Sequence, residues 1–151
     1  MHKEKTILLV DDCQDDLLLM RSAFRKAAFH NPVQELHNGE AAIAYLKGDG
    51  RYSDRDKFPL PMVMILDLNM PMKNGFEVLT WLRDQPGLKR LAVIILSASK
   101  RVEDVERAFE LGISLFLVKP ISLEELISMS CLLRDLLRIN HFPSLHETVK
   151  R

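Results

Sequence analysis

Cysteine, excess charge and long apolar runs are all scarce in this sequence, and each scarcity excludes a class of protein. Two cysteines, Cys13 and Cys131, cannot form the disulfide framework of a small secreted domain, so a reducing, cytoplasmic location is expected. Basic and acidic residues number 21 each, which argues against a direct nucleic-acid partner. The apolar stretches are too short for a secretory signal or a membrane span, so no membrane association is expected.

The composition is that of a single globular domain. At 151 residues, with 47% hydrophobic and 28% charged residues, the chain can bury a core without disulfides. We expect one domain over residues 1–139, with a long polar loop at 48–61, and a short tail at 140–151. No second domain fits in what remains.

Short apolar runs alternate along the chain with helical patterns. Four runs are continuous rather than alternating, as expected of strands buried on both faces, and a fifth, more polar run suits an edge strand. The four are 7–10, 62–66, 91–96 and 115–118, and the edge strand is 33–37. Strand and helix follow each other five times, which predicts an α/β fold with a parallel sheet covered by helices on both sides.

Helix starts and apolar faces can be assigned between these runs. We expect Asp15 or Asp16 to cap the first helix and Asn38 to cap the second. In the fourth helix, Val102 and Phe109 share one apolar face with Val105. In the last helix, which begins after Ser122 with Glu125 at the capping-box position, the leucines and isoleucines cover more than one stripe. The surplus suggests a partner or self-association surface, unless the loop or the tail covers it.

Polar side chains follow the strands at their carboxyl ends, where ligands bind in open α/β sheets. Asp11 and Asp12 follow the first strand, Asp67 the third, Ser97 the fourth and Lys119 the fifth. Three close carboxylates raise one another's pKa, and a divalent cation such as Mg²⁺ relieves that repulsion. Lys119 and Ser97 suit a phosphoryl anion, and an Asp can act as a nucleophile that forms an aspartyl phosphate. Read singly, these residues could be turn or surface residues.

Four motifs, taken in order, resemble the receiver domain of two-component response regulators. They are "VDD" (10–12), "LDLNMP…NG" (66–75), "LSAS" (96–99) and "FLVKP" (116–120). The long loop with "GRY" and the stretch "SKRVEDVERAFELG" are similar to stand-alone, single-domain regulators paired with bacterial phytochromes. The resemblance implies a three-layer, flavodoxin-like (βα)5 fold with strand order 2-1-3-4-5 and no output domain.

The resemblance also assigns the metal and the phosphoacceptor. It implies that Asp67 accepts the phosphoryl group. Asp11, Asp12 and Asp67, together with the backbone carbonyl of Asn69, would bind the Mg²⁺ cofactor. Asp15 and Asp16 are interpreted instead as acids favoured by the dipole at a helix start.

The remaining implied roles concern the phosphoryl group and the signal. Ser97 and Lys119 would contact the phosphoryl oxygens, and Phe116 would turn inward when Ser97 moves. The Lys119–Pro120 peptide bond is expected to be cis. The sequence departs from the family at two of these positions. Phe116 occupies a position where the family often has Tyr, and Ser97 occupies one where Thr is commoner. Its tail also lacks the aromatic-rich ending expected of the phytochrome-linked group.

These residues predict a phosphorylation-controlled switch rather than a turnover enzyme. A sensor histidine kinase or phosphotransfer protein would phosphorylate Asp67. Output to a downstream protein target, or to a homodimer, would pass through the face of the fourth helix, fifth strand and fifth helix. The alternatives are a relay intermediate, a phosphate sink and a phosphorylation-independent pseudo-receiver. An aspartyl-phosphate phosphatase would need an acid where Asn69 stands, and nucleotide or flavin binding would need a Gly-rich phosphate loop.

Overall fold

A single parallel sheet of five strands forms the centre of the molecule. The structure, a computed structural model, describes residues 5–139. The sheet has the order β2-β1-β3-β4-β5, so the predicted fold class and strand order are confirmed. Its strands are β1 (Ile7–Val10), β2 (Val33–Leu36), β3 (Val63–Asp67), β4 (Ala92–Ser97) and β5 (Leu115–Val118).

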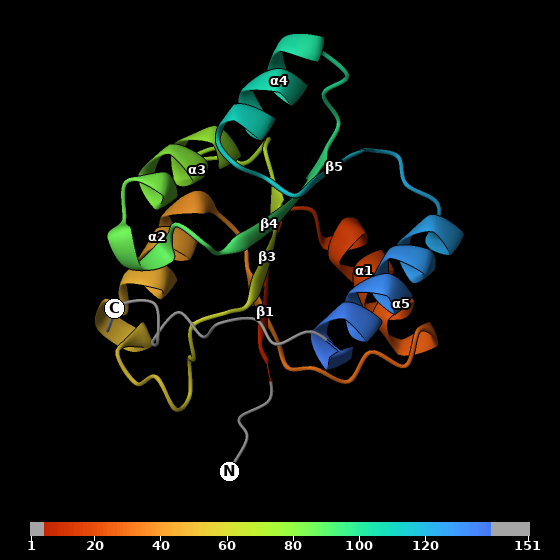
Figure 1. The fold of residues 1–151 in the computed structure, drawn as a ribbon, viewed down its shortest axis with the longest axis horizontal. Helices are drawn as coiled ribbons and strands as arrows, with labels where there is room; N and C mark the ends of the chain where they lie inside the picture. Colours follow the sequence, from red (N-terminus) through yellow and green to blue (C-terminus); the bar gives the residue numbers. More distant parts are fainter. Residues whose placement is uncertain (1–4, 140–151) are drawn as a thin grey trace.

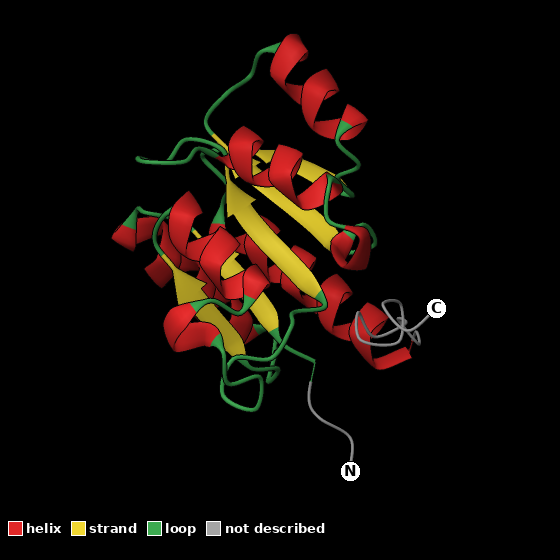
Figure 2. Cartoon of the chain, turned by 90° about the vertical axis from the view of Figure 1, so that its left-hand side faces the viewer, coloured by secondary structure: helices red, strands yellow, loops and turns green. Residues whose placement is uncertain are grey.

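Helices cover both faces of this sheet and produce three layers. On one face α1 and α5 lie side by side, and on the other lie α2 and α3 (Figure 1; Figure 2). The helices are α1 (Gln14–Lys26), α2 (Gly39–Lys47), α3 (Gly75–Arg83), α4 (Val102–Glu110) and α5 (Leu123–Ile139), with short 3₁₀ helices η1 (Gly50–Tyr52) and η2 (Pro86–Leu88).

Two apolar cores lie on opposite faces of the sheet because successive side chains of a strand point to opposite sides. In β1, Ile7 and Leu9 face α1 and α5, whereas Leu8 and Val10 face α2 and α3. All four side chains are almost completely buried. This explains why the strands read as continuous apolar runs rather than as alternating ones.

The first helix begins earlier than predicted. Its N-cap is Cys13, in extended conformation, so the assignment of the cap to Asp15 or Asp16 was wrong. The reason is local: the Asp11 carboxylate accepts the backbone N–H of Cys13 at 2.9 Å and turns the chain into the helix immediately. Asp15 and Asp16 therefore lie in the first turn, where acidic side chains interact favourably with the helix dipole.

The caps predicted for two other helices are confirmed. Asn38 accepts the backbone N–H of Ala41 at 2.8 Å at the start of α2. Ser122 accepts the backbone N–H of Glu125 at 3.1 Å before α5, and its hydroxyl donates to the Glu125 carboxylate at 3.0 Å. Each cap side chain accepts one backbone N–H that has no partner within the helix.

The loop at 48–61 is less polar in its packing than its composition suggested. The rings of Tyr52 and Phe58 lie against Tyr45 of α2, with centroids 5.2 and 6.0 Å away. Arg55 donates to the backbone carbonyl of Tyr45 at 2.7 Å and to another carbonyl in the last turn of α2. The loop thus has an aromatic core of its own and closes the end of α2.

Two of the three residues of the apolar face predicted for α4 are exposed, and the third, Val105, is partly buried. Val102 is 65% and Phe109 49% exposed, and Ala108 is the buried residue of this helix. Figure 1 shows α4 at the end of the molecule beyond β5. On α5, a buried stripe that includes Leu133 is accompanied by an exposed stripe that includes Leu132.

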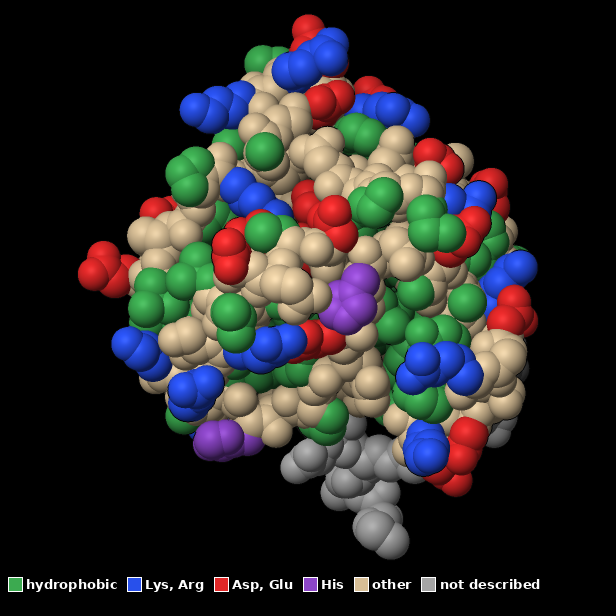
Figure 3. All heavy atoms as spheres, turned by 180° about the vertical axis from the view of Figure 1, so that it is seen from behind, with side chains coloured by type: hydrophobic (Ala, Val, Ile, Leu, Met, Phe, Trp, Pro, Cys, Tyr) green, Lys and Arg blue, Asp and Glu red, His purple; other side chains and the backbone are tan. Residues whose placement is uncertain are grey.

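Charges of both signs are interspersed on the face shown in Figure 3, in keeping with the zero net charge. None of the helices within residues 5–139 is long and apolar enough to cross a membrane. The predicted tail at 140–151 lies outside the described residues.

Candidate functional site

Three carboxylates meet at the carboxyl end of the sheet. Asp67 is the last residue of β3, and Asp11 and Asp12 directly follow the neighbouring strand β1. One oxygen from each of the three lies within 4.8 Å of the other two. Asp11 and Asp67 are buried, with 3% and 6% exposure, whereas Asp12 is exposed. The cluster is therefore closed toward the core and open on the side of Asp12.

Lys119 brings the positive charge to this cluster from the loop after β5. Its Nζ lies 3.0 Å from Oδ2 of Asp11 and 3.5 Å from Oδ2 of Asp67. It also lies 2.7 Å from Oδ2 of Asp16, in the first turn of α1. The predicted strand-end residues come together, and Asp16 joins them, a contact that the sequence pattern did not indicate because helix-start acids are common.

Ser97, the last residue of β4, is completely buried beside the carboxylates. Its Oγ accepts the backbone N–H of Ser99 at 3.1 Å and the side-chain amide of Asn69 at 3.4 Å. The backbone N–H of Asn69 donates to Oδ1 of Asp67 at 3.1 Å. One loop residue thus connects the hydroxyl of Ser97 with the carboxylate of Asp67.

A glycine allows the loop after β3 to turn sharply behind Asp67. A Cβ placed on Gly75 would lie 2.7 Å from the carbonyl oxygen of Asp67, so no larger residue fits without displacing the strand end. Gly75 donates its N–H to the carbonyl of Leu68 at 2.9 Å. In the same loop, Met72 has a φ of 67° and is 67% exposed. Neither feature was assigned from the sequence.

Phe116, the predicted switch residue, lies in β5, and Lys119, a predicted phosphoryl contact, directly follows that strand. Phe116 is half-buried in β5 and packs against the core under α2 and α3. The backbone N–H of Lys119 donates to the carbonyl of Ser97 at 2.7 Å, and the Lys119–Pro120 peptide bond is cis. The main chains of the two phosphoryl-contact candidates are therefore joined directly.

The pKa values of Asp67 and Lys119 are shifted by their surroundings. Burial raises the pKa of Asp67 to about 6, although the N–H of Asn69 and the charge of Lys119 oppose this shift. Asp11 and Asp12 raise it further. Burial alone would lower the pKa of Lys119, but its hydrogen bonds to Asp16 and Asp11 and the charge of Asp67 outweigh burial and raise it.

The donor set fits a hard divalent cation. Three carboxylates of like charge converge, and one of them is exposed, which leaves room for water ligands. Mg²⁺ binds through one or two carboxylates and keeps several waters. Sulfur and imidazole, which softer metals prefer, are absent from the cluster of Asp11, Asp12 and Asp67.

A parallel sheet of this order with acids and a lysine at its carboxyl edge defines a class of signalling protein. The model of the response regulator receiver domain matches residues 7–130, and the chain belongs to this family. Its members take part in two-component signalling and bind divalent metal. Response regulator Rcp1 of Synechocystis is 35% identical over 125 residues, which are 83% of this chain and 83% of Rcp1.

Solved structures show the same similarity. The phosphorylated cyanobacterial phytochrome response regulator RcpA has a TM-score of 0.81 and 30% identity, covering 93% of this chain and 99% of that one. The Mn²⁺-bound form of Rcp1 has a TM-score of 0.79 and 33% identity, over 93% of this chain and 99% of Rcp1.

Proposed function

We propose that this protein is a phosphorylation-controlled switch that accepts a phosphoryl group on Asp67 in the presence of Mg²⁺. The observation that carries the proposal is the position of Asp67. It is a buried carboxylate at the end of β3, with two further carboxylates within 4.8 Å and the ammonium group of Lys119 at 3.5 Å. The phosphorylated state of RcpA, a protein of the same fold, supports it.

The transfer is a displacement at phosphorus. An oxygen of Asp67 attacks the phosphorus of a phosphohistidine, a P–O bond forms, and the P–N bond to the donor's imidazole breaks with its electron pair remaining on nitrogen. Lys119 and the hydroxyl of Ser97 bind the phosphoryl oxygens and hold them in place. Attack by water on the phosphorus later returns the carboxylate of Asp67 and ends the signal.

The cation would be held by Asp11, Asp12 and Asp67 together with the backbone carbonyl of Asn69. When bound, Mg²⁺ supplies positive charge that offsets the repulsion between these carboxylates and the incoming phosphoryl group. The Mn²⁺-bound form of Rcp1, a protein of the same family, supports a divalent cation as the ligand.

The signal is proposed to pass from Ser97 and Phe116 to the surface of α4, β5 and α5. Movement of Ser97 toward the phosphoryl group frees space next to β5 for the ring of Phe116, which is half-buried in the resting state. The exposed apolar side chains on this surface support contact with another protein. They are Val102, Phe109, Leu115, Val118, Leu132 and Leu136.

The phosphodonor is proposed to be a sensor histidine kinase, and specifically one of the phytochrome class. RcpA is described as a phytochrome response regulator, and a bacteriophytochrome response regulator, RtBRR, matches 97% of this chain with a TM-score of 0.76. The alternatives that keep the same chemistry are a relay intermediate and a phosphate sink. A light-responsive kinase that phosphorylates this protein faster than an unrelated kinase does would support the phytochrome assignment.

The chemistry can be tested without the kinase. The protein is incubated with acetyl phosphate, with Mg²⁺ or with EDTA, and its intact mass is measured. One phosphoryl adduct that requires Mg²⁺ and is missing in Asp67→Asn is the expected result. An adduct that persists unchanged in Asp67→Asn would overturn the assignment, and release of phosphate without an adduct would indicate rapid hydrolysis of the phosphorylated state.

A further inference from the structure

The shortest contact of Lys119 is with a carboxylate outside the three-carboxylate cluster. Its Nζ lies 2.7 Å from Oδ2 of Asp16, against 3.0 Å for Asp11 and 3.5 Å for Asp67. Asp16 is not part of the group of carboxylates whose oxygens lie within 4.8 Å of one another. Within residues 5–139, Lys119 is the ion-pair partner of Asp16. A structural role in α1 alone does not explain this contact.

The ammonium group of Lys119 has three N–H donors, and three carboxylates surround it. Two are hydrogen bonds, to Asp11 and Asp16, while Asp67 lies at the distance of an ion pair. The side chain of Lys119 is 17% exposed, so water replaces few of these partners. The contact with Asp67 is the longest of the three, so a phosphoryl oxygen on Asp67 would have to draw the ammonium group away from its shorter contact with Asp16.

Asp16 and Asp67 attract the ammonium group from different elements. Asp16 lies in the first turn of α1, and Asp67 lies at the end of β3. The position nearer to Asp16 is favoured in the resting protein, because a charge-assisted hydrogen bond at 2.7 Å is stronger than an ion pair at 3.5 Å.

On these contacts we propose that Asp16 is a positioning residue that holds Lys119 in the resting state and competes with the phosphoryl group of Asp67 for its ammonium group. The inference rests on the function proposed above. It predicts that Asp16 weakens binding of the phosphoryl group and thereby limits the stability of the active state. Removing its charge while keeping its shape should release Lys119 toward Asp67.

The test measures affinity for beryllofluoride, a mimic of the phosphoryl group, at saturating Mg²⁺ by ¹⁹F NMR titration. Asp16→Asn should bind it about three- to tenfold more tightly than the wild type, a change in the range of a partly exposed charged contact. Asp16→Glu, which keeps the charge, should bind close to the wild-type value. Tighter binding separates a positioning role from general damage to the fold, which would weaken it.

Asp15→Asn is the matched control because Asp15 carries the same charge in the same helical turn and is exposed. It should change the affinity by less than about twofold, as expected for an exposed charge without a contact to Lys119. A second control places Asp16→Asn in a Lys119→Met background, where the gain should vanish because Asp16 acts through Lys119.

Three results would overturn the inference. They are an equal gain in Asp15→Asn and Asp16→Asn, weaker binding by Asp16→Asn, and a gain that persists without Lys119. Wild-type protein that forms no Mg²⁺-dependent adduct on Asp67 and binds no beryllofluoride contradicts the proposed function itself. Wild-type protein that does both, with no change in Asp16→Asn, contradicts only the role of Asp16.

Discussion

Asp67 is held in a position that is unfavourable for a free carboxylate and useful for a phosphoacceptor. Burial keeps its pKa near 6, while Lys119 and the N–H of Asn69 stabilise its charged form only in part. A buried ionisable residue that is needed for function commonly lowers the stability of the folded protein. The loss of stability caused by the carboxylate of Asp67 can be measured.

In the presence of EDTA, Asp67→Asn should stabilise the protein at pH 7.5 by on the order of 1–3 kcal/mol, because it removes a buried charge. The folded-state pKa of about 6 lies above the ordinary value of 3.8. The contribution of Asp67 to the free energy of unfolding is therefore greatest below pH 3.8, where the carboxyl group is protonated in both states. It is lost as the pH rises through 6, because the buried group then becomes charged. The gain in Asp67→Asn should grow over the same range, measured by urea unfolding.

Asp84→Asn is the control for this experiment because Asp84 is exposed at the end of α3. Its effect should stay within about 0.5 kcal/mol and should not vary with pH in the same way. A variant at Asp67 that is less stable, or whose gain is the same at pH 4 and pH 7.5, would show that the carboxylate is not strained by burial.

Most residues at the site follow from the sequence, and the reason is geometric. The carboxyl ends of parallel strands meet at one edge, so Asp11, Asp67, Ser97 and Lys119 had to lie near one another once the strands were assigned. The contact of Asp16 with Lys119 was not predicted, because it depends on the residue at which α1 begins and on the direction in which the Lys119 side chain extends. The sequence pattern indicates neither of these.

The strands were predictable because they are continuous apolar runs. The packing of the loop at 48–61 and the exposure of α4 were not predictable, because they depend on contacts that no sequence period indicates. β1, β3, β4 and β5 read as continuous apolar runs, so their positions followed to within about one residue. The loop at 48–61 has polar composition, and its aromatic core, in which Tyr52 and Phe58 pack against Tyr45 of the preceding helix, follows no regular spacing. α4 had a clear apolar face, but the sequence does not say whether such a face is covered by the sheet or by another protein.

The loop at 48–61 offers a prediction about the stability of α2. Arg55 donates three hydrogen bonds to backbone carbonyls, two of them at the end of α2. Arg55→Met should destabilise the protein by about 2–3 kcal/mol, because it leaves partly buried carbonyls without partners. Urea unfolding followed by circular dichroism measures the change.

Arg51→Met is the matched control. Arg51 is exposed and lies over the ring of Tyr52 at 5.2 Å without comparable carbonyl contacts. Its loss should cost less than about 1 kcal/mol. Equal losses for Arg51→Met and Arg55→Met would show that the carbonyl contacts do not hold the loop to α2.

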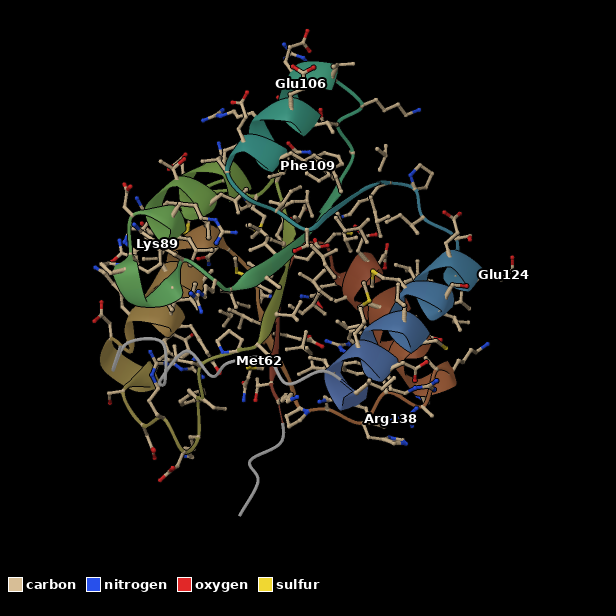
Figure 4. The ribbon with its side chains drawn as sticks, in the orientation of Figure 1. Met62, Lys89, Glu106, Phe109, Glu124 and Arg138 are labelled. Atoms are coloured by element: carbon tan, nitrogen blue, oxygen red, sulfur yellow. The ribbon has the colours of Figure 1, made fainter. Side chains whose placement is uncertain are left out.

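At the scale of the whole molecule, α4, β5 and α5 each leave apolar side chains exposed. In Figure 4, Phe109 on α4 lies in the upper part of the molecule and Arg138, near the end of α5, in the lower part. Phe109 and Val102 on α4, with Leu115 and Val118 on β5, have little cover within residues 5–139. Exposed apolar groups of this kind favour association over the free state.

Phosphorylation, or beryllofluoride with Mg²⁺, should therefore promote self-association through this surface. Sedimentation velocity should show a shift toward dimer in the wild type and a return to monomer in Phe109→Lys, because a charge replaces an apolar contact. Leu18→Lys, at a residue of α1 that is 57% exposed, is the control and should behave like the wild type. A dimer that survives Phe109→Lys but is lost in Leu18→Lys would assign the interface to α1.

The measurement that most directly tests the central claim is the chemical location of the phosphoryl group. Protein phosphorylated with acetyl phosphate and Mg²⁺ is treated with borohydride, which reduces an acyl phosphate to an alcohol and converts the modified aspartate to homoserine. Peptide mass spectrometry then identifies the residue. We predict homoserine at Asp67 and at neither Asp11 nor Asp12. Homoserine at another aspartate would contradict the account.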